Sequence, residues 1–310
     1  MLMEHLIKFV KGIAIGIANI IPGFSGGTMA VIVKIYDEFV SALASLTKTP
    51  LVVLKKSWSL FLGILIGVIA GFVGIVKLLE IAPLVTILFF FGLVLGSIPK
   101  QGMTALTKPV NPKTWIAFGI AFAIIVLLPF LSEFKASQIE EITFVHYIFI
   151  FLLGILSSAA MVLPGLSGSM ILLIFGYYHF VMSSAKVFVK GFFTFEFSGL
   201  STPFLALLCL AIGIAIGIIV MSKIVKKLYT KYPSYFNMAI FGLLIASLFA
   251  ILYSSNVEYN YTLFKVNAWQ WFVGIVLAIL GTLCTISLDF LGSRKKEEEV
   301  VVNDNQVSNV

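Results

Sequence analysis

A run of small and polar residues that could bind an anion occurs twice in this 310-residue chain, each time within strongly apolar sequence. The first motif reads Asn-Ile-Ile-Pro-Gly-Phe-Ser-Gly-Gly-Thr over residues 19–28. The second reads Met-Val-Leu-Pro-Gly-Leu-Ser-Gly-Ser over residues 161–169. Proline lacks a backbone donor and glycine costs backbone entropy, so each motif should break a helix. Two matched breaks in an apolar chain predict a binding site near the middle of a membrane.

The residue types in the motifs are suited to phosphate. A helix that starts after each break presents unpaired N–H groups and about half a positive charge. Hydroxyl and amide groups add donors, and glycines allow the backbone to approach a ligand closely. The alternative is that these small residues serve only close helix packing, which leaves the matched copies unexplained. The predicted phosphate-binding residues are Asn19, Gly23, Ser25, Gly26, Gly27, Thr28, Gly165, Ser167, Gly168 and Ser169.

Few ionisable residues lie in the apolar regions, where a charge costs about 2.5–3.5 kcal/mol on insertion scales. Asp37 and Glu38 follow the first motif, and His179 lies at the corresponding place after the second. These three residues are candidates for proton coupling or gating. The alternatives are that the two carboxylates lie in water at the open end of a helical hairpin, and that the histidine serves only in polar packing near the membrane interface.

Composition defines the class of protein. Hydrophobic residues make up 60% of the chain and charged residues 11%, which leaves too little polar surface for a soluble protein. The apolar runs are continuous rather than alternating, so we predict an all-α polytopic membrane protein. The formal charge of +7 comes from basic residues in short loops, where they set membrane topology and do not indicate nucleic-acid binding.

Six apolar segments approach the roughly 20 residues that a membrane span needs. They are Trp58–Leu79, Pro83–Ile98, Thr114–Leu131, Pro203–Met221, Tyr235–Tyr253 and Trp269–Phe290. The motifs divide the other apolar regions, 7–46 and 147–189, into pieces of which several are too short to cross about 30 Å of hydrocarbon. Each of these regions is therefore predicted to be a re-entrant helical hairpin with the motif at its tip.

Basic residues gather on one side of this six-span arrangement, with clusters at Lys55–Lys56, Lys100–Lys113, Lys223–Lys231 and Arg294–Lys296. That asymmetry indicates that this side is cytoplasmic, together with both chain termini. Each loop would lie on the same side of the membrane if each interrupted region crossed it fully as a pair of helices. Segment length alone therefore favours the re-entrant hairpins.

Similarity between the halves extends beyond the motifs. At an offset of 142 residues, Gly12 matches Gly154, Ser25 matches Ser167 and Tyr36 matches Tyr178. Each half consists of one hairpin and three spans, over residues 1–135 and 136–292, and residues 293–310 are expected to form a disordered cytoplasmic tail. Because three is odd, the second half begins on the opposite face. The halves are thus predicted to form an inverted repeat, as in many secondary transporters.

A membrane phosphatase is a further class to weigh. The motif resembles the Pro-Gly-x-Ser-Arg-Ser-Gly stretch of undecaprenyl-pyrophosphate phosphatases, but Gly26 and Gly168 stand where that family has arginine. The paired-glutamate motif of that family is also missing. Such an enzyme needs a nucleophile or base, and arginine or a metal to hold the leaving phosphate. The sequence therefore predicts no enzyme, with no catalytic residue, metal or cofactor.

The motifs over residues 18–28 and 164–169 resemble those of a bacterial membrane family that is now regarded as polyprenyl-phosphate (undecaprenyl-phosphate) transporters. The resemblance covers nearly the whole chain. It implies that undecaprenyl phosphate returns from the outer to the inner leaflet of the cytoplasmic membrane, for reuse in cell-wall synthesis. Lys34 departs from the Gly-x-Tyr-Glu pattern of that family, and Asp37 replaces its glutamate, whereas Gly176 in the second copy keeps the glycine.

The residues alone leave two other functions open. The same motifs could serve a transporter or channel for a small inorganic anion, phosphate or sulfate. A scaffold that recruits cell-wall enzymes without transport would leave the repeat unexplained. The expected partners are the polyprenyl-phosphate lipid and membrane lipids.

Overall fold

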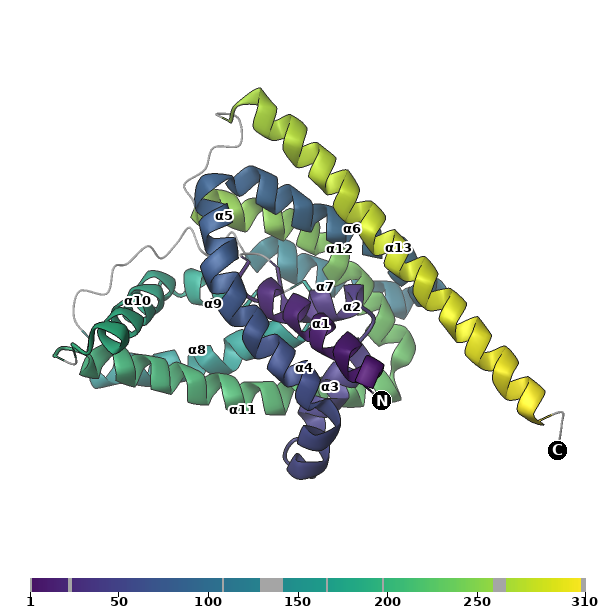
Figure 1. Cartoon of the computed structure of the whole chain (residues 1–310), viewed down its shortest axis with the longest axis horizontal. Coiled ribbons are helices and arrows are strands. Elements are labelled where there is room, and N and C mark those ends of the chain that lie inside the picture. Colours follow the sequence, from purple (N-terminus) through teal and green to yellow (C-terminus); the bar gives the residue numbers. More distant parts are fainter. Residues whose placement is uncertain are drawn as a thin grey trace.

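The computed structural model describes residues 2–21, 24–107, 109–128, 142–165, 167–196, 198–258 and 266–307. Over these residues the chain folds into helices joined by short turns and contains no strand (Figure 1). Six of the helices are long and apolar enough to cross a membrane. The predicted all-α polytopic membrane class is confirmed.

The first half contains α1 to α7, with a short π-helix between α4 and α5. The bounds are α1 Leu2–Ala18, α2 Gly26–Ile32, α3 Tyr36–Ser45, α4 Pro50–Ala70, the π-helix Gly71–Ile75, α5 Val76–Ile81, α6 Pro83–Leu106 and α7 Pro112–Leu127. Proline in the first turn begins α4, α6 and α7, where its missing N–H would have no helical partner.

The second half contains α8 to α13. The bounds are α8 Phe144–Val162, α9 Gly168–Ile174, α10 Tyr178–Thr194, α11 Ser201–Lys231, α12 Pro233–Glu258 and α13 Ala268–Val307. The six helices of spanning length are α4, α6, α8, α11, α12 and α13. The short α9 meets α10 at a bend of 117°.

The set of spanning helices differs from the predicted one at two places. The segment predicted over 114–131 is the helix α7, whose 16 residues are short for a span, and residues 129–141 lie outside the described residues. Conversely, α8 has 19 residues and qualifies by length and composition, although it was predicted as the arm of a re-entrant hairpin. Its helix runs unbroken through Ser157 and Ser158 because no proline occurs in this region before Pro164 of the second motif.

Helix ends also extend beyond the predicted limits. The first span begins at Pro50, so Lys55 and Lys56 lie within α4 and not in the preceding loop. The tail predicted to be disordered is instead a continuation of α13 as far as Val307. The tail begins with a run of arginine, lysine and glutamate, which have high helix propensity and can prolong a helix that the span has already nucleated.

The two halves use the same helix pairings. The helix before each motif packs along the first long helix after it, α1 on α4 and α8 on α11. A methyl group added at Gly12 would lie 3.0 Å from Cα of Gly63, and one at Gly154 would lie 3.1 Å from Cα of Gly213. Both pairs of helices therefore cross in backbone contact, which small residues permit in membranes.

The last helix of each half packs on the other half. Helix α13 packs on α6, and α7 packs on α12. In Figure 1, α13 forms one flank of the molecule, while α8 and α11 run side by side along another. The side chain of Thr282 donates to the carbonyl of Gly92 at 3.0 Å, and Thr285 donates to Leu93 at 3.0 Å. The halves are thus interlocked, and their inversion across the membrane stays a prediction.

The main core surrounds α2, which carries the end of the first motif. Phe24 is 1% exposed and contacts the ring of Phe90 on α6 with centroids 5.5 Å apart. Val162 at the end of α8 and Leu244 on α12 belong to the same buried cluster. The packing therefore holds both motifs in the interior.

Candidate functional site

The two motifs touch each other in the core. Thr28 and Ser25 are 0% and 1% exposed. The backbone N–H of Gly165 donates to Oγ1 of Thr28 at 2.7 Å, and the hydroxyl of Ser25 donates to the carbonyl of Leu163 at 3.2 Å. A methyl group on Gly27 would lie 2.7 Å from the carbonyl oxygen of Val162. The structure thus brings the first motif directly against the backbone of the second.

Local capping builds the start of α2. Ser25 has extended backbone at φ −128°, and its hydroxyl accepts the N–H of Thr28 at 3.1 Å. Asn19 accepts the N–H of Gly26 at 3.0 Å and donates its own amide to the carbonyl of Ile15 at 3.0 Å. Asn19 therefore ties the end of α1 to the start of α2. Two of the first N–H groups of α2 already have partners within the motif.

The second motif is built differently. Ser167 makes no side-chain bond to the start of α9, and its hydroxyl instead contacts that of Ser169 at 2.8 Å. Gly165 has φ +85°, and a methyl group there would lie 2.5 Å from the carbonyl oxygen of Leu243. Only glycine suits both the left-handed backbone and this contact. Gly168 is half-buried, and Pro22 and Gly23 of the first motif lie outside the described residues.

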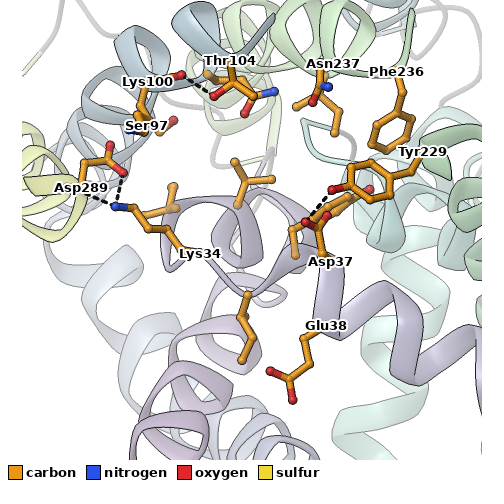
Figure 2. A pocket seen from close by; sticks show the side chains of 16 residues that line it. Lys34, Asp37, Glu38, Ser97, Lys100, Thr104, Tyr229, Phe236, Asn237 and Asp289 are labelled. Carbon is orange, nitrogen blue, oxygen red and sulfur yellow. Dashed lines mark hydrogen bonds and ion pairs between the residues drawn. The ribbon is translucent and has the colours of Figure 1, made fainter. Parts of the chain in front are cut away.

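A polar pocket of about 480 Å³ lies at the other end of α2 (Figure 2). Its walls come from α2, α3 and the turn between them, and from α6, α11, α12 and α13. The lining residues are Val31, Ile32, Lys34, Ile35, Tyr36, Asp37, Glu38, Ser97, Lys100, Gln101, Thr104, Tyr229, Phe236, Asn237, Ile240 and Asp289. Tyr36 also donates its hydroxyl to the carbonyl of Val162 at 3.2 Å, so the pocket wall reaches the second motif.

The carboxylates that line the pocket each have a partner. Nζ of Lys34 lies 2.9 Å from Oδ1 of Asp289 on one side of the pocket, and Tyr229 donates to Oδ2 of Asp37 at 2.8 Å on the other (Figure 2). Behind the pocket, the buried Lys8 of α1 bridges Glu38 at 2.7 Å and Glu4 at 2.9 Å. Each of the three pocket carboxylates therefore has a donor or a cation as its partner.

The sequence-based prediction found part of this pocket. It singled out Asp37 and Glu38, and both line the cavity. His179 does not: it is exposed on α10, with its ring 5.5 Å from that of Tyr178. Lys8 and Tyr229 were missed. The glutamate four positions before Lys8 was an available signal for an ion pair in α1, but Tyr229 is recognisable only from its contact with Asp37.

Fold and site together define a helical polytopic membrane protein with broken helices that meet in its interior, an architecture used by secondary transporters. The chain belongs to the undecaprenyl phosphate translocase-like family, whose model matches residues 15–269 and 186–301. This is a family of transporters and not of enzymes.

Two relatives carry the name polyprenyl-phosphate transporter. The one from Staphylococcus aureus (strain NCTC 8325 / PS 47) is 29% identical over 91% of this chain and 95% of its own length. The one from Vibrio cholerae serotype O1 (strain ATCC 39315 / El Tor Inaba N16961) is 30% identical over 79% of this chain and 77% of its own length. No solved structure matches the chain.

Proposed function

We propose that this protein translocates undecaprenyl phosphate across the bacterial cytoplasmic membrane, from the outer to the inner leaflet, so that the lipid carrier can be reused in cell-wall synthesis. Family membership and the names of the two relatives support the lipid class. The observation that carries the proposal is the buried contact of two donor-rich motifs, through Thr28 and Gly165.

The chemistry of the motifs suits a lipid phosphate. Moving a phosphate through hydrocarbon is costly unless its oxygens are hydrogen-bonded along the way. Ser25, Thr28 and Ser167 supply buried hydroxyl groups, and the half-buried Ser169 adds another. Asn19 and the motif glycines add amide donors. The isoprenoid tail can remain in the bilayer while only the head group passes the motifs.

The described conformation is closed at this point. The hydroxyls of Ser25 and Thr28 are engaged with the second motif, so a phosphate can use them only if the motifs separate. We assign this separation as the step that opens the path. Tyr36 links α3 to the carbonyl of Val162, so movement of the first hairpin would also move the edge of the second motif.

The substrate is tested with the full-length protein in proteoliposomes. Undecaprenyl phosphate is supplied to one leaflet, and its arrival in the other is measured against protein-free vesicles. A second set of vesicles measures uptake of inorganic phosphate and of sulfate. The proposal predicts protein-dependent lipid exchange. Uptake of the inorganic anions without lipid exchange would instead establish the small-anion transporter. The absence of both activities would contradict both functions.

Direction is tested in the same vesicles once the inserted orientations are separated by protease protection of the chain termini. We expect net movement of lipid toward the side that carries both termini, which we assign as cytoplasmic because the basic residues gather there. Net movement toward the opposite side would contradict the proposed recycling direction.

A further inference from the structure

Lys34 has a backbone conformation that lysine rarely adopts. Its φ is +55°, in the left-handed region, and the residue 142 positions later is Gly176 with φ +77°. Glycine takes this conformation without strain, whereas a residue with Cβ does not. The turn after each short helix therefore requires the same backbone, and the first half carries a strained lysine in that place. Its side chain should provide something that a glycine cannot.

The amine of Lys34 lies in the wall of the polar pocket. It is 2.9 Å from Oδ1 of Asp289 and donates to the carbonyls of Asp289 at 2.7 Å and Leu288 at 3.1 Å. The side chain of Lys34 is 31% exposed and that of Asp289 is 17% exposed. Figure 2 shows the pair to one side of the pocket, and the partial exposure of Lys34 keeps its amine accessible.

The other charges of the pocket are arranged around this pair. Lys100 lines the same cavity, and Ser97 and Gln101 place further polar groups on the adjacent turns of α6. Asp37 is held by Tyr229, and Glu38 by Lys8. An anion that enters the pocket must therefore compete with Asp289 for the amine of Lys34. A carboxylate in that position occupies the place that a phosphate oxygen would take.

We propose that this pocket binds the phosphomonoester head group after it has passed the motifs, with Asp289 acting as an exchangeable counter-ion. Asp289 releases Lys34 when the phosphate arrives and takes it back when the phosphate leaves. This inference rests on the proposed function. The motif contact and the pocket lie at opposite ends of α2, whose seven residues span about 10 Å. A cavity of about 480 Å³ accommodates a phosphate with water or the first part of a prenyl chain.

Binding to the purified full-length protein in detergent tests the exchange. The probes are farnesyl phosphate and, in a separate arm, inorganic phosphate. Asp289→Asn removes the negative charge beside the amine of Lys34 and should tighten farnesyl phosphate binding by about tenfold, while Lys34→Gly should weaken it by about tenfold. Glycine suits the left-handed turn, so an unchanged melting temperature of the Lys34→Gly variant will separate lost binding from lost folding.

Asp37→Asn is the matched control, because it removes the same charge from the same pocket without releasing a lysine. Tightening by Asp289→Asn alone supports the exchange, and equal tightening by both variants would overturn it. A response with farnesyl phosphate only assigns the pocket to the lipid head group, and a response with both probes assigns it to phosphate from either source. Suppose that Asp289→Asn and Lys34→Gly bind both probes with the affinity of the wild type, and that the wild-type protein transports lipid. That result would overturn the pocket assignment and leave the proposed function standing.

Discussion

At the scale of single residues, Thr28 joins the two motifs. Its Oγ1 accepts the buried N–H of Gly165 at 2.7 Å and contacts the hydroxyl of Ser25 at 3.0 Å. A buried donor that loses its acceptor is costly, because it cannot turn to water. This one hydroxyl therefore stabilises the closed conformation and also belongs to the proposed phosphate path.

Replacing Thr28 by valine tests that role. The change keeps the shape of the side chain but leaves the N–H of Gly165 without its acceptor, so stability should fall by about 1–3 kcal/mol. Thr28→Ser keeps the hydroxyl and should retain both stability and lipid exchange. Thermal unfolding in detergent measures the stability of each variant, and the vesicle assay measures its lipid exchange. Equal behaviour of the two variants would show that the hydroxyl is not required.

Removing Cβ at Lys34 and adding Cβ at Gly176 should have opposite effects on stability. Left-handed backbone costs a residue with Cβ about 1–3 kcal/mol, while a partly exposed ion pair is worth about 0–1 kcal/mol. Lys34→Gly should therefore leave the melting temperature unchanged or higher. Gly176→Ala adds Cβ at φ +77° and should lower stability by about 1 kcal/mol. A large loss of stability in Lys34→Gly would mean that the ion pair with Asp289 stabilises the protein by more than the left-handed backbone of Lys34 costs.

At the scale of helices, the sequence predicted features with local causes. The breaks around Ser25 and Ser167 follow from proline and glycine, and the long apolar runs around α6, α11, α12 and α13 predicted spans. Pairing between distant helices, such as α6 with α13, leaves no local signal. Lys8 has one partner, Glu4, within its own helix, but its second partner, Glu38, is thirty positions away and is revealed only by the folded chain.

The candidate site likewise combines residues that the sequence predicted with contacts that it did not. The motif residues were predictable because their types and spacing repeat. The pocket was only partly predictable, because it combines residues from α2, α3 and the turn between them with residues from four other helices that are distant in the sequence. The left-handed turn at Lys34 left a faint signal in the glycine at position 176, but the contact with Asp289 depends on how α13 packs.

Helix crossing at Gly12 gives a prediction with an internal control. A methyl group there would meet the backbone of α4 at Leu60 and Gly63, so Gly12→Ala should destabilise the protein by about 1–3 kcal/mol. A methyl group at Gly119 on α7 meets nothing within 4 Å, and Gly119→Ala should be neutral or stabilising. Denaturation in detergent compares them. Equal stability of both variants would contradict the close α1–α4 contact.

At the scale of the whole molecule, the repeated pairings and the basic asymmetry together support two interlocked halves of opposite orientation. Cysteine labelling tests that topology, in a background with Cys209 and Cys284 replaced by alanine. A cysteine at Lys48 should react with a membrane-impermeant maleimide from the cytoplasmic side, and one at Glu196 from the opposite side. Labelling of both from the same side would contradict the proposed arrangement.

Passage of a lipid phosphate between the two motifs is tested most directly by leaflet exchange of undecaprenyl phosphate in proteoliposomes. The variant pairs Ser25→Ala with Ser167→Ala, and the control pairs Ser222→Ala with Ser247→Ala, two buried serines that donate only to carbonyls of their own helices. We expect exchange to be lost in the motif variant and retained in the control, at equal amounts of folded protein. Exchange at the wild-type rate in the motif variant would contradict passage between the motifs.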